Sequence, residues 1–148
     1  MLEPFYFVLG LANTLLLTII FSLRKKYFSV IKKFGWLYLL LAIPAIYAIY
    51  LVHIEQKTVR YTIFLVIFLA FLLIEALYDY VLKIPFRETM NWKQLLPYVA
   101  LYISMNYGFV VMVWKYDSLA RGAVLLILMV IQLILNLVTH PRPAVKNS

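Results

Sequence analysis

We predict an all-α fold, in which five transmembrane helices form the bundle of a polytopic integral membrane protein. Hydrophobic residues make up 66% of the 148-residue chain and charged residues 14%, and the mean hydropathy is +0.93. A soluble domain of this composition would expose too much apolar surface to water. The apolar residues form five stretches, at 4–23, 36–54, 61–82, 95–114 and 122–139. Each approaches or reaches the about 20 residues with which a helix crosses the hydrocarbon layer, where helices satisfy their own backbone groups.

The first two stretches carry boundary signals of their own. Residues 4–23 are too long and too apolar for a cleavable signal peptide, lack a basic leader and precede the basic run at 24–26. These features predict a retained helix. Trp36 opens the second stretch as an interfacial anchor, and Tyr6 and Tyr61 are expected to lie at similar depths. Pro44 removes a hydrogen bond in the middle of the second helix, so we expect a bend there.

The remaining three stretches follow with short links. The third, at 61–82, carries two acidic residues, Glu75 and Asp79. Asn91 and Gln94 form a capping pair that opens the fourth helix, and Gly122 opens the fifth after a turn at 115–121. Because no low-complexity run or spacer separates the helices, residues 1–148 are predicted to form a single transmembrane domain.

Lysines and arginines are distributed unevenly over the two membrane sides. Ten fall on one side, at Arg24, Lys25, Lys26, Lys32, Lys33, Lys83, Arg87, Lys93, Arg142 and Lys146, and four on the other, at Lys57, Arg60, Lys115 and Arg121. The positive-inside rule therefore predicts an amino terminus outside and a carboxyl terminus in the cytoplasm. Topology and attraction to anionic membrane lipids account for the net charge of +8, so no nucleic-acid partner is expected. The short loops and clear charge rule favour a prokaryotic plasma membrane.

Polar residues inside the apolar stretches recur every four positions. The sets are Glu75 and Asp79; Tyr98, Tyr102 and Asn106; Gln132, Asn136 and His140; and Gly10, Thr14, Thr18 and Ser22. Four residues are about one helical turn, so each set forms one stripe, and such residues are tolerated where they face protein or water. The predicted topology also brings the stripes to matching depths, with Asn106 and Gln132 together near the midplane. This pattern predicts an intramembrane pocket that opens toward the cytoplasm.

The predicted pocket is centred on Glu75. An ionisable group at this depth costs on the order of 2 to 3 kcal/mol, whereas a hydrogen bond between helices returns about 1 kcal/mol, so a purely structural role is a poor explanation. Two carboxyl groups one turn apart do not both ionise readily, which suits proton coupling or binding of a protonated amine. The expected ligand-binding residues are Glu75, Asp79, Tyr98, Tyr102, Asn106, Gln132, Asn136 and His140.

Three function classes fit these residues. The leading one is binding or translocation of a cationic or polar-headed small amphiphile, and a homodimer would help five short helices to enclose enough volume. The second is an intramembrane enzyme acting on a lipid, sterol or isoprenoid, with Glu75 and Asp79 as acid and base and Tyr102 as a proton or hydrogen-bond donor. The third is an assembly or scaffold subunit in which Glu75 meets a basic residue of a partner within the membrane.

Several chemistries are excluded by what the chain lacks. Without cysteine there are no disulfides, thiolate metal sites, iron–sulfur clusters or cysteine nucleophiles. The two histidines, His53 and His140, fall at opposite membrane faces and cannot hold one haem. No glycine loop for phosphate, histidine pair at metal spacing or glycine-flanked serine is present. We therefore expect neither a metal nor a cofactor.

Overall fold

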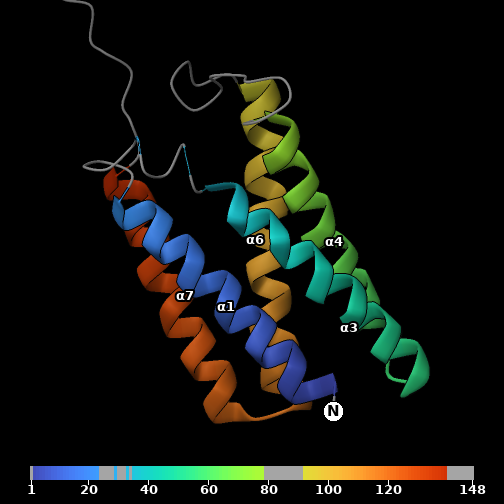
Figure 1. Cartoon of the computed structure of the whole chain (residues 1–148). Coiled ribbons are helices and arrows are strands. Elements are labelled where there is room, and N and C mark those ends of the chain that lie inside the picture. The colour runs from blue at the N-terminus through green and yellow to red at the C-terminus, as the bar shows by residue number, and fades with distance from the viewer. Residues whose placement is uncertain (1, 24–28, 30–32, 34, 79–91, 140–148) are drawn as a thin grey trace, which may run out of the picture.

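The computed structural model describes residues 2–23, 29, 33, 35–78 and 92–139, and Figure 1 shows their arrangement. The elements in chain order are α1 (Leu2–Leu23), the 3₁₀ helix η1 (Gly35–Leu41), α3 (Ala42–Ile54), α4 (Val59–Ala76), α6 (Trp92–Tyr116) and α7 (Leu119–Thr139). Within the described residues, five helical segments are long and apolar enough to cross a membrane, with η1 and α3 counted as one. The prediction of an all-helical chain with five candidate spans is confirmed.

The helix boundaries differ from the predicted ones by a few residues. The first, third, fourth and fifth helices each begin two or three residues earlier than the apolar stretches, because the helix continues through a charged residue that precedes each stretch. The last α7 residue, Thr139, agrees with the prediction. The predicted end of the third helix, at 79–82, lies outside the described residues.

The segment before Pro44 differs in kind from the expectation. Residues Gly35–Leu41 form a 3₁₀ helix, and the α-helix begins only at Ala42. Pro44 therefore lies in the first turn of α3 and not in the middle of an α-helix, although η1 and α3 together form one candidate span, Gly35–Ile54. The expected place of the proline inside an α-helix is wrong, because the chain changes helix type before it reaches the proline, whereas the expected bend stays a prediction.

The helices pack as two pairs that contact each other through α6 and directly through α1 and α3. In Figure 1, α1 runs beside α7 and α3 runs beside α4, while α6 contacts α1, α4 and α7. The amino terminus, the turn after α3 and the turn between α6 and α7 lie at the same end of the bundle (Figure 1). This arrangement brings residues from every segment toward a shared interior.

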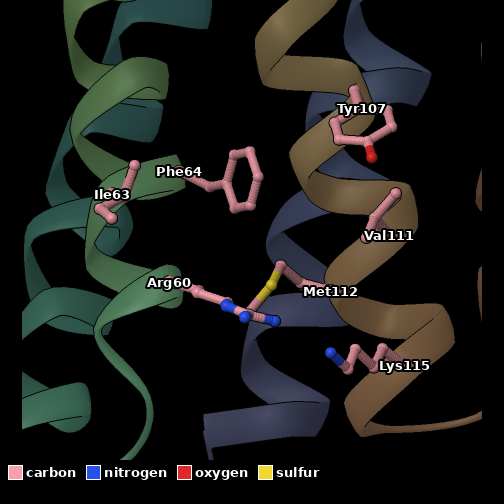
Figure 2. Close-up of a pocket in the computed structure, with 7 residues that line it drawn as sticks. All are labelled: Arg60, Ile63, Phe64, Tyr107, Val111, Met112 and Lys115. Carbon is pink, nitrogen blue, oxygen red and sulfur yellow. The ribbon is translucent and has the colours of Figure 1, made fainter.

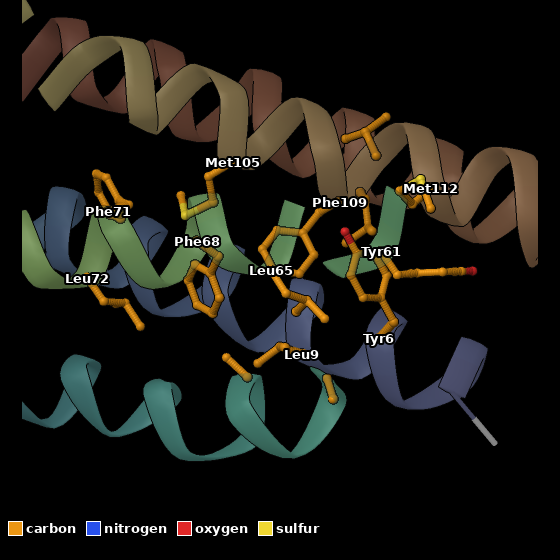
Figure 3. Packing of buried hydrophobic residues seen from close by; sticks show 14 of the residues in the cluster. Tyr6, Leu9, Tyr61, Leu65, Phe68, Phe71, Leu72, Met105, Phe109 and Met112 are labelled. Carbon is orange, nitrogen blue, oxygen red and sulfur yellow. The ribbon is translucent and has the colours of Figure 1, made fainter. Parts of the chain in front are cut away.

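Aromatic and aliphatic side chains fill that interior. Figure 3 shows them in a row, from Tyr6 and Tyr61 at one end to Phe71 at the other. Tyr6 and Tyr61 were expected as interfacial anchors but are both buried, with ring centroids 5.0 Å apart in an edge-to-face contact. The Tyr6 hydroxyl donates to the Gly108 carbonyl oxygen at 3.2 Å, so its polar end is satisfied by protein.

Two glycines on α6 and α7 allow close approach between elements. A Cβ at Gly108 would lie 2.3 Å from Cδ1 of Phe64 on α4. A Cβ at Gly122 would lie 2.7 Å from the Trp114 Cα, where α7 folds back on α6. The missing side chains therefore set the spacing of α4 and α7 against α6.

The outward faces of the bundle are apolar. Large side chains such as Ile43, Trp92 and Leu137 are exposed, and 75% of the Leu137 surface is accessible. A surface of this kind is unstable in water and suits contact with lipid chains. Burial and exposure thus agree with an integral membrane location.

Candidate functional site

An aromatic cluster around Phe71 occupies the interior near one end of the bundle. The fully buried Phe71 ring on α4 contacts Tyr38 on η1 at 6.5 Å between centroids, and Tyr98 and Tyr102 on α6 at 5.2 and 5.9 Å. Phe21 on α1 adds a contact with Tyr102 at 6.3 Å. Tyr98 and Tyr102 both face this cluster because they are four residues apart on one helix.

Two buried hydrogen bonds connect this cluster to α1 and α7. The Tyr38 hydroxyl donates to Oδ1 of Asn13 on α1, and Nε2 of Gln132 on α7 donates to the Tyr102 hydroxyl oxygen at 2.7 Å. All five candidate spans therefore contribute to one layer. We call Asn13, Tyr38, Glu75, Tyr98, Tyr102 and Gln132, together with Phe71 at their centre, the polar layer.

The two amides of the polar layer each keep one unsatisfied atom. Asn13 and Gln132 are both 0% exposed. Among the described residues, neither Nδ2 of Asn13 nor Oε1 of Gln132 has a hydrogen-bond partner. An unmet buried polar atom costs about 1 to 3 kcal/mol, and most such atoms in native proteins are satisfied. One atom is a donor and the other an acceptor, so the layer can both give and receive a hydrogen bond.

Glu75 is the acidic residue of the polar layer. It follows Phe71 by one helical turn, and its carboxyl group is close enough to the Tyr38 hydroxyl to interact with it electrostatically. The side chain is half-buried, so the bundle shields only part of it. Partial shielding follows from its position in the last turn of α4.

The structure brings together half of the predicted site residues. Glu75, Tyr98, Tyr102 and Gln132 belong to the polar layer. Asn106 is buried, but its Nδ2 donates to the Tyr102 carbonyl oxygen of its own helix at 2.9 Å. Asn136 is half-buried, one turn beyond Gln132. Asp79 and His140 lie outside the described residues.

The depth of Gln132 differs from the expected one. Depth matching paired it with Asn106, whereas it hydrogen-bonds to Tyr102, one turn nearer the start of α6. Tyr98 and Tyr102 lie six and ten residues after Trp92, which is about 9 and 15 Å along the helix. The polar layer is thus set inside the bundle, toward the end where α6 begins.

The polar stripe predicted on α1 is satisfied within the helix. The hydroxyls of Thr14, Thr18 and Ser22 each donate to the carbonyl oxygen four residues earlier, at 2.7 to 2.8 Å. Asn13, next to this stripe, is the α1 residue that enters the polar layer. Sequence reasoning missed Asn13 and Tyr38, although an amide in the middle of an apolar stretch was a usable signal for Asn13.

Within the described ranges, no group of three histidine, aspartate or glutamate side chains could hold a metal ion. Comparisons with protein-family models, curated proteins and solved structures found no match to this chain. The function is therefore argued from the polar layer itself.

Proposed function

We propose that the polar layer binds the head of a cationic or polar-headed small amphiphile, and that the protein binds or translocates this molecule from the cytoplasmic side of the membrane. The main support for this proposal is the pair of unsatisfied amide atoms, Nδ2 of Asn13 and Oε1 of Gln132. A ligand that offers one acceptor and one donor would satisfy both, and the benefit is large where water is scarce. Packing alone leaves this pair of unmet groups unexplained.

Charge and aromatic surface favour a cation over an anion or a neutral molecule. Glu75 provides a negative charge at the layer, and the rings of Tyr38, Phe71, Tyr98 and Tyr102 offer the faces that attract ammonium groups. An ammonium group donates to Glu75 and to Oε1 of Gln132. A hydroxyl on the neighbouring carbon accepts from Nδ2 of Asn13. A long-chain amino alcohol is therefore the ligand class that matches the layer.

Binding of three amphiphiles to the purified protein tests this chemistry. Isothermal titration in detergent should rank 2-amino-1-dodecanol above dodecylamine by about threefold, because the hydroxyl adds one intramembrane hydrogen bond. 1-Dodecanol, which has no charge, should bind more weakly than both. Equal binding of the three compounds contradicts the assigned roles of Glu75 and Asn13.

The Glu75→Gln variant separates the function classes. We expect amine binding to fall by more than about tenfold with the helical fold retained, since a hydrogen bond to a charged group is lost. Glu55→Gln is the matched control, because Glu55 lies at the opposite end of the bundle and its carboxylate accepts from the Leu2 N–H at 3.1 Å. An enzyme would instead keep substrate binding and lose turnover, and a scaffold would lose a protein partner. If the protein also translocates the ligand, the amine should cross the membrane of proteoliposomes when a pH gradient is applied.

A further inference from the structure

Two adjoining hollows lie at the end of the bundle opposite the polar layer. The first, of 320 Å³, is lined by α4 and α6 and includes Arg60, Phe64, Val111 and Lys115 (Figure 2). The second, of 430 Å³, lies beside it and is lined by Val110, Val111, Trp114 and Lys115. The volumes fall in the range of about 300 to 1,000 Å³ of small-ligand sites. Because both hollows share Val111 and Lys115, we call them the paired hollow, and Val111 is the apolar residue that lines both.

The basic residues of the paired hollow differ from their neighbours in having no carboxylate partner. At this end, Lys57 pairs with Glu3 at 2.7 Å, and Arg121 pairs with Asp117 at 3.1 Å. Among the described residues, no carboxylate pairs with the side chain of Arg60 or Lys115. Figure 2 shows both side chains extending from their helices toward the space between α4 and α6. Two positive charges thus face one space without a negative partner.

Apolar residues lie deeper in the same hollow. Arg60 is in the first turn of α4 and Lys115 in the last turn of α6, so both lie at the ends of candidate membrane spans. Phe64 and Val111 lie one turn farther inside, and Met112 is a buried wall residue. Phe64 fits there because Gly108 has no side chain in its way. The hollow therefore places charge at the interface and apolar surface beneath it, in the order of a lipid head and chain.

We propose that the paired hollow binds an anionic phospholipid. Its phosphate lies between Arg60 and Lys115, and its two acyl chains lie on either side of Val111. We infer an anionic lipid because Arg60 and Lys115, which have no carboxylate partner among the described residues, both line the hollow. We infer two chains because two apolar hollows adjoin at Val111. This site is separate from the polar layer and does not depend on the proposed function.

Native mass spectrometry of the detergent-purified full chain tests the charge requirement. Each basic residue near an anionic surface strengthens attraction by at most about fivefold. Phosphatidylglycerol, whose head carries a net negative charge, should therefore bind more tightly than zwitterionic phosphatidylcholine, by up to about 25-fold. Arg60→Gln combined with Lys115→Gln should remove this preference. Lys93→Gln, which removes an exposed lysine at the other end of α6, should preserve it. Equal affinity of the wild type for both lipids, or an equal loss in the Lys93→Gln control, overturns the proposal.

Two experiments test the requirement for two acyl chains: a comparison of two lipids, and a variant that fills the hollow. Lysophosphatidylglycerol has the same head but one chain, so it should bind the wild-type protein more weakly than the diacyl lipid. Val111→Trp places a large side chain where the two hollows adjoin without changing charge, and it should weaken the binding of both diacyl lipids alike, with folding verified by circular dichroism. Equal binding of the one-chain and two-chain lipids overturns the assignment without any variant. Undiminished binding by a folded Val111→Trp protein overturns it as well.

Discussion

Replacing Tyr102 by phenylalanine removes the hydroxyl that accepts the Gln132 amide at 2.7 Å. Hydrogen bonds between helices in membranes contribute about 0.6 kcal/mol on average and reach about 1.7 kcal/mol. Gln132 is 0% exposed and its Oε1 is already unsatisfied among the described residues, so the variant leaves the whole amide unmet. We therefore expect destabilisation in the upper part of that range, about 1 to 1.7 kcal/mol. Gln132→Leu removes the amide together with its unmet acceptor and should be close to neutral.

Equilibrium unfolding in mixed micelles with increasing sodium dodecyl sulfate, followed by far-ultraviolet circular dichroism, measures these differences. The double variant Tyr102→Phe with Gln132→Leu should be about as stable as Gln132→Leu alone, because residue 132 no longer carries an amide that needs the Tyr102 hydroxyl. The reasoning is refuted if Tyr102→Phe lies within about 0.3 kcal/mol of the wild type while Gln132→Leu is strongly destabilised. That result would assign Gln132 to packing alone.

Three further predictions concern packing, ionisation and topology. Gly108→Ala should lower the free energy of unfolding by about 1 to 3 kcal/mol in the same assay, because its Cβ would overlap an aromatic ring 2.3 Å away, and an unchanged value would contradict the close approach. The hydrogen bond with Glu3 raises the pKa of Lys57 above its ordinary value of 10.5, so this pair stabilises the fold below that value. The thermal stability difference between the wild type and Lys57→Gln should be present at neutral pH and disappear as the pH rises through the raised pKa; a difference that persists there would refute the ion pair. Since the chain has no cysteine, an impermeant maleimide added to intact cells should label Gln56→Cys but not Lys93→Cys, and the reverse pattern would invert the predicted orientation.

The helices were predictable because hydropathy over about 20 residues depends on composition and not on tertiary contacts. The change from 3₁₀ to α-helix before Pro44 was not, because the proline indicates only that one backbone hydrogen bond is missing. The helix type also depends on tertiary packing, and η1 contacts α1, α3 and α4.

The polar layer was also partly predictable from the composition of the apolar stretches. Gln132 and Glu75 are polar groups within apolar stretches, which marks them as facing protein or water. Asn13 carried this signal too, but it falls outside the four-residue step of Thr14 and Thr18, whose hydroxyls bond within their own helix. Tyr38 carried no signal, because tyrosine is common at membrane interfaces. Depth inferred from sequence position was wrong by one helical turn, so it could not pair Gln132 with Tyr102.

An experimental density map of the protein prepared with 2-amino-1-dodecanol tests the central claim most directly. The account predicts elongated density whose head lies within hydrogen-bond distance of Nδ2 of Asn13 and Oε1 of Gln132, close to the Glu75 carboxylate. Water-sized density at the two amides, or protein groups that satisfy both atoms with the amino alcohol bound elsewhere, would contradict it.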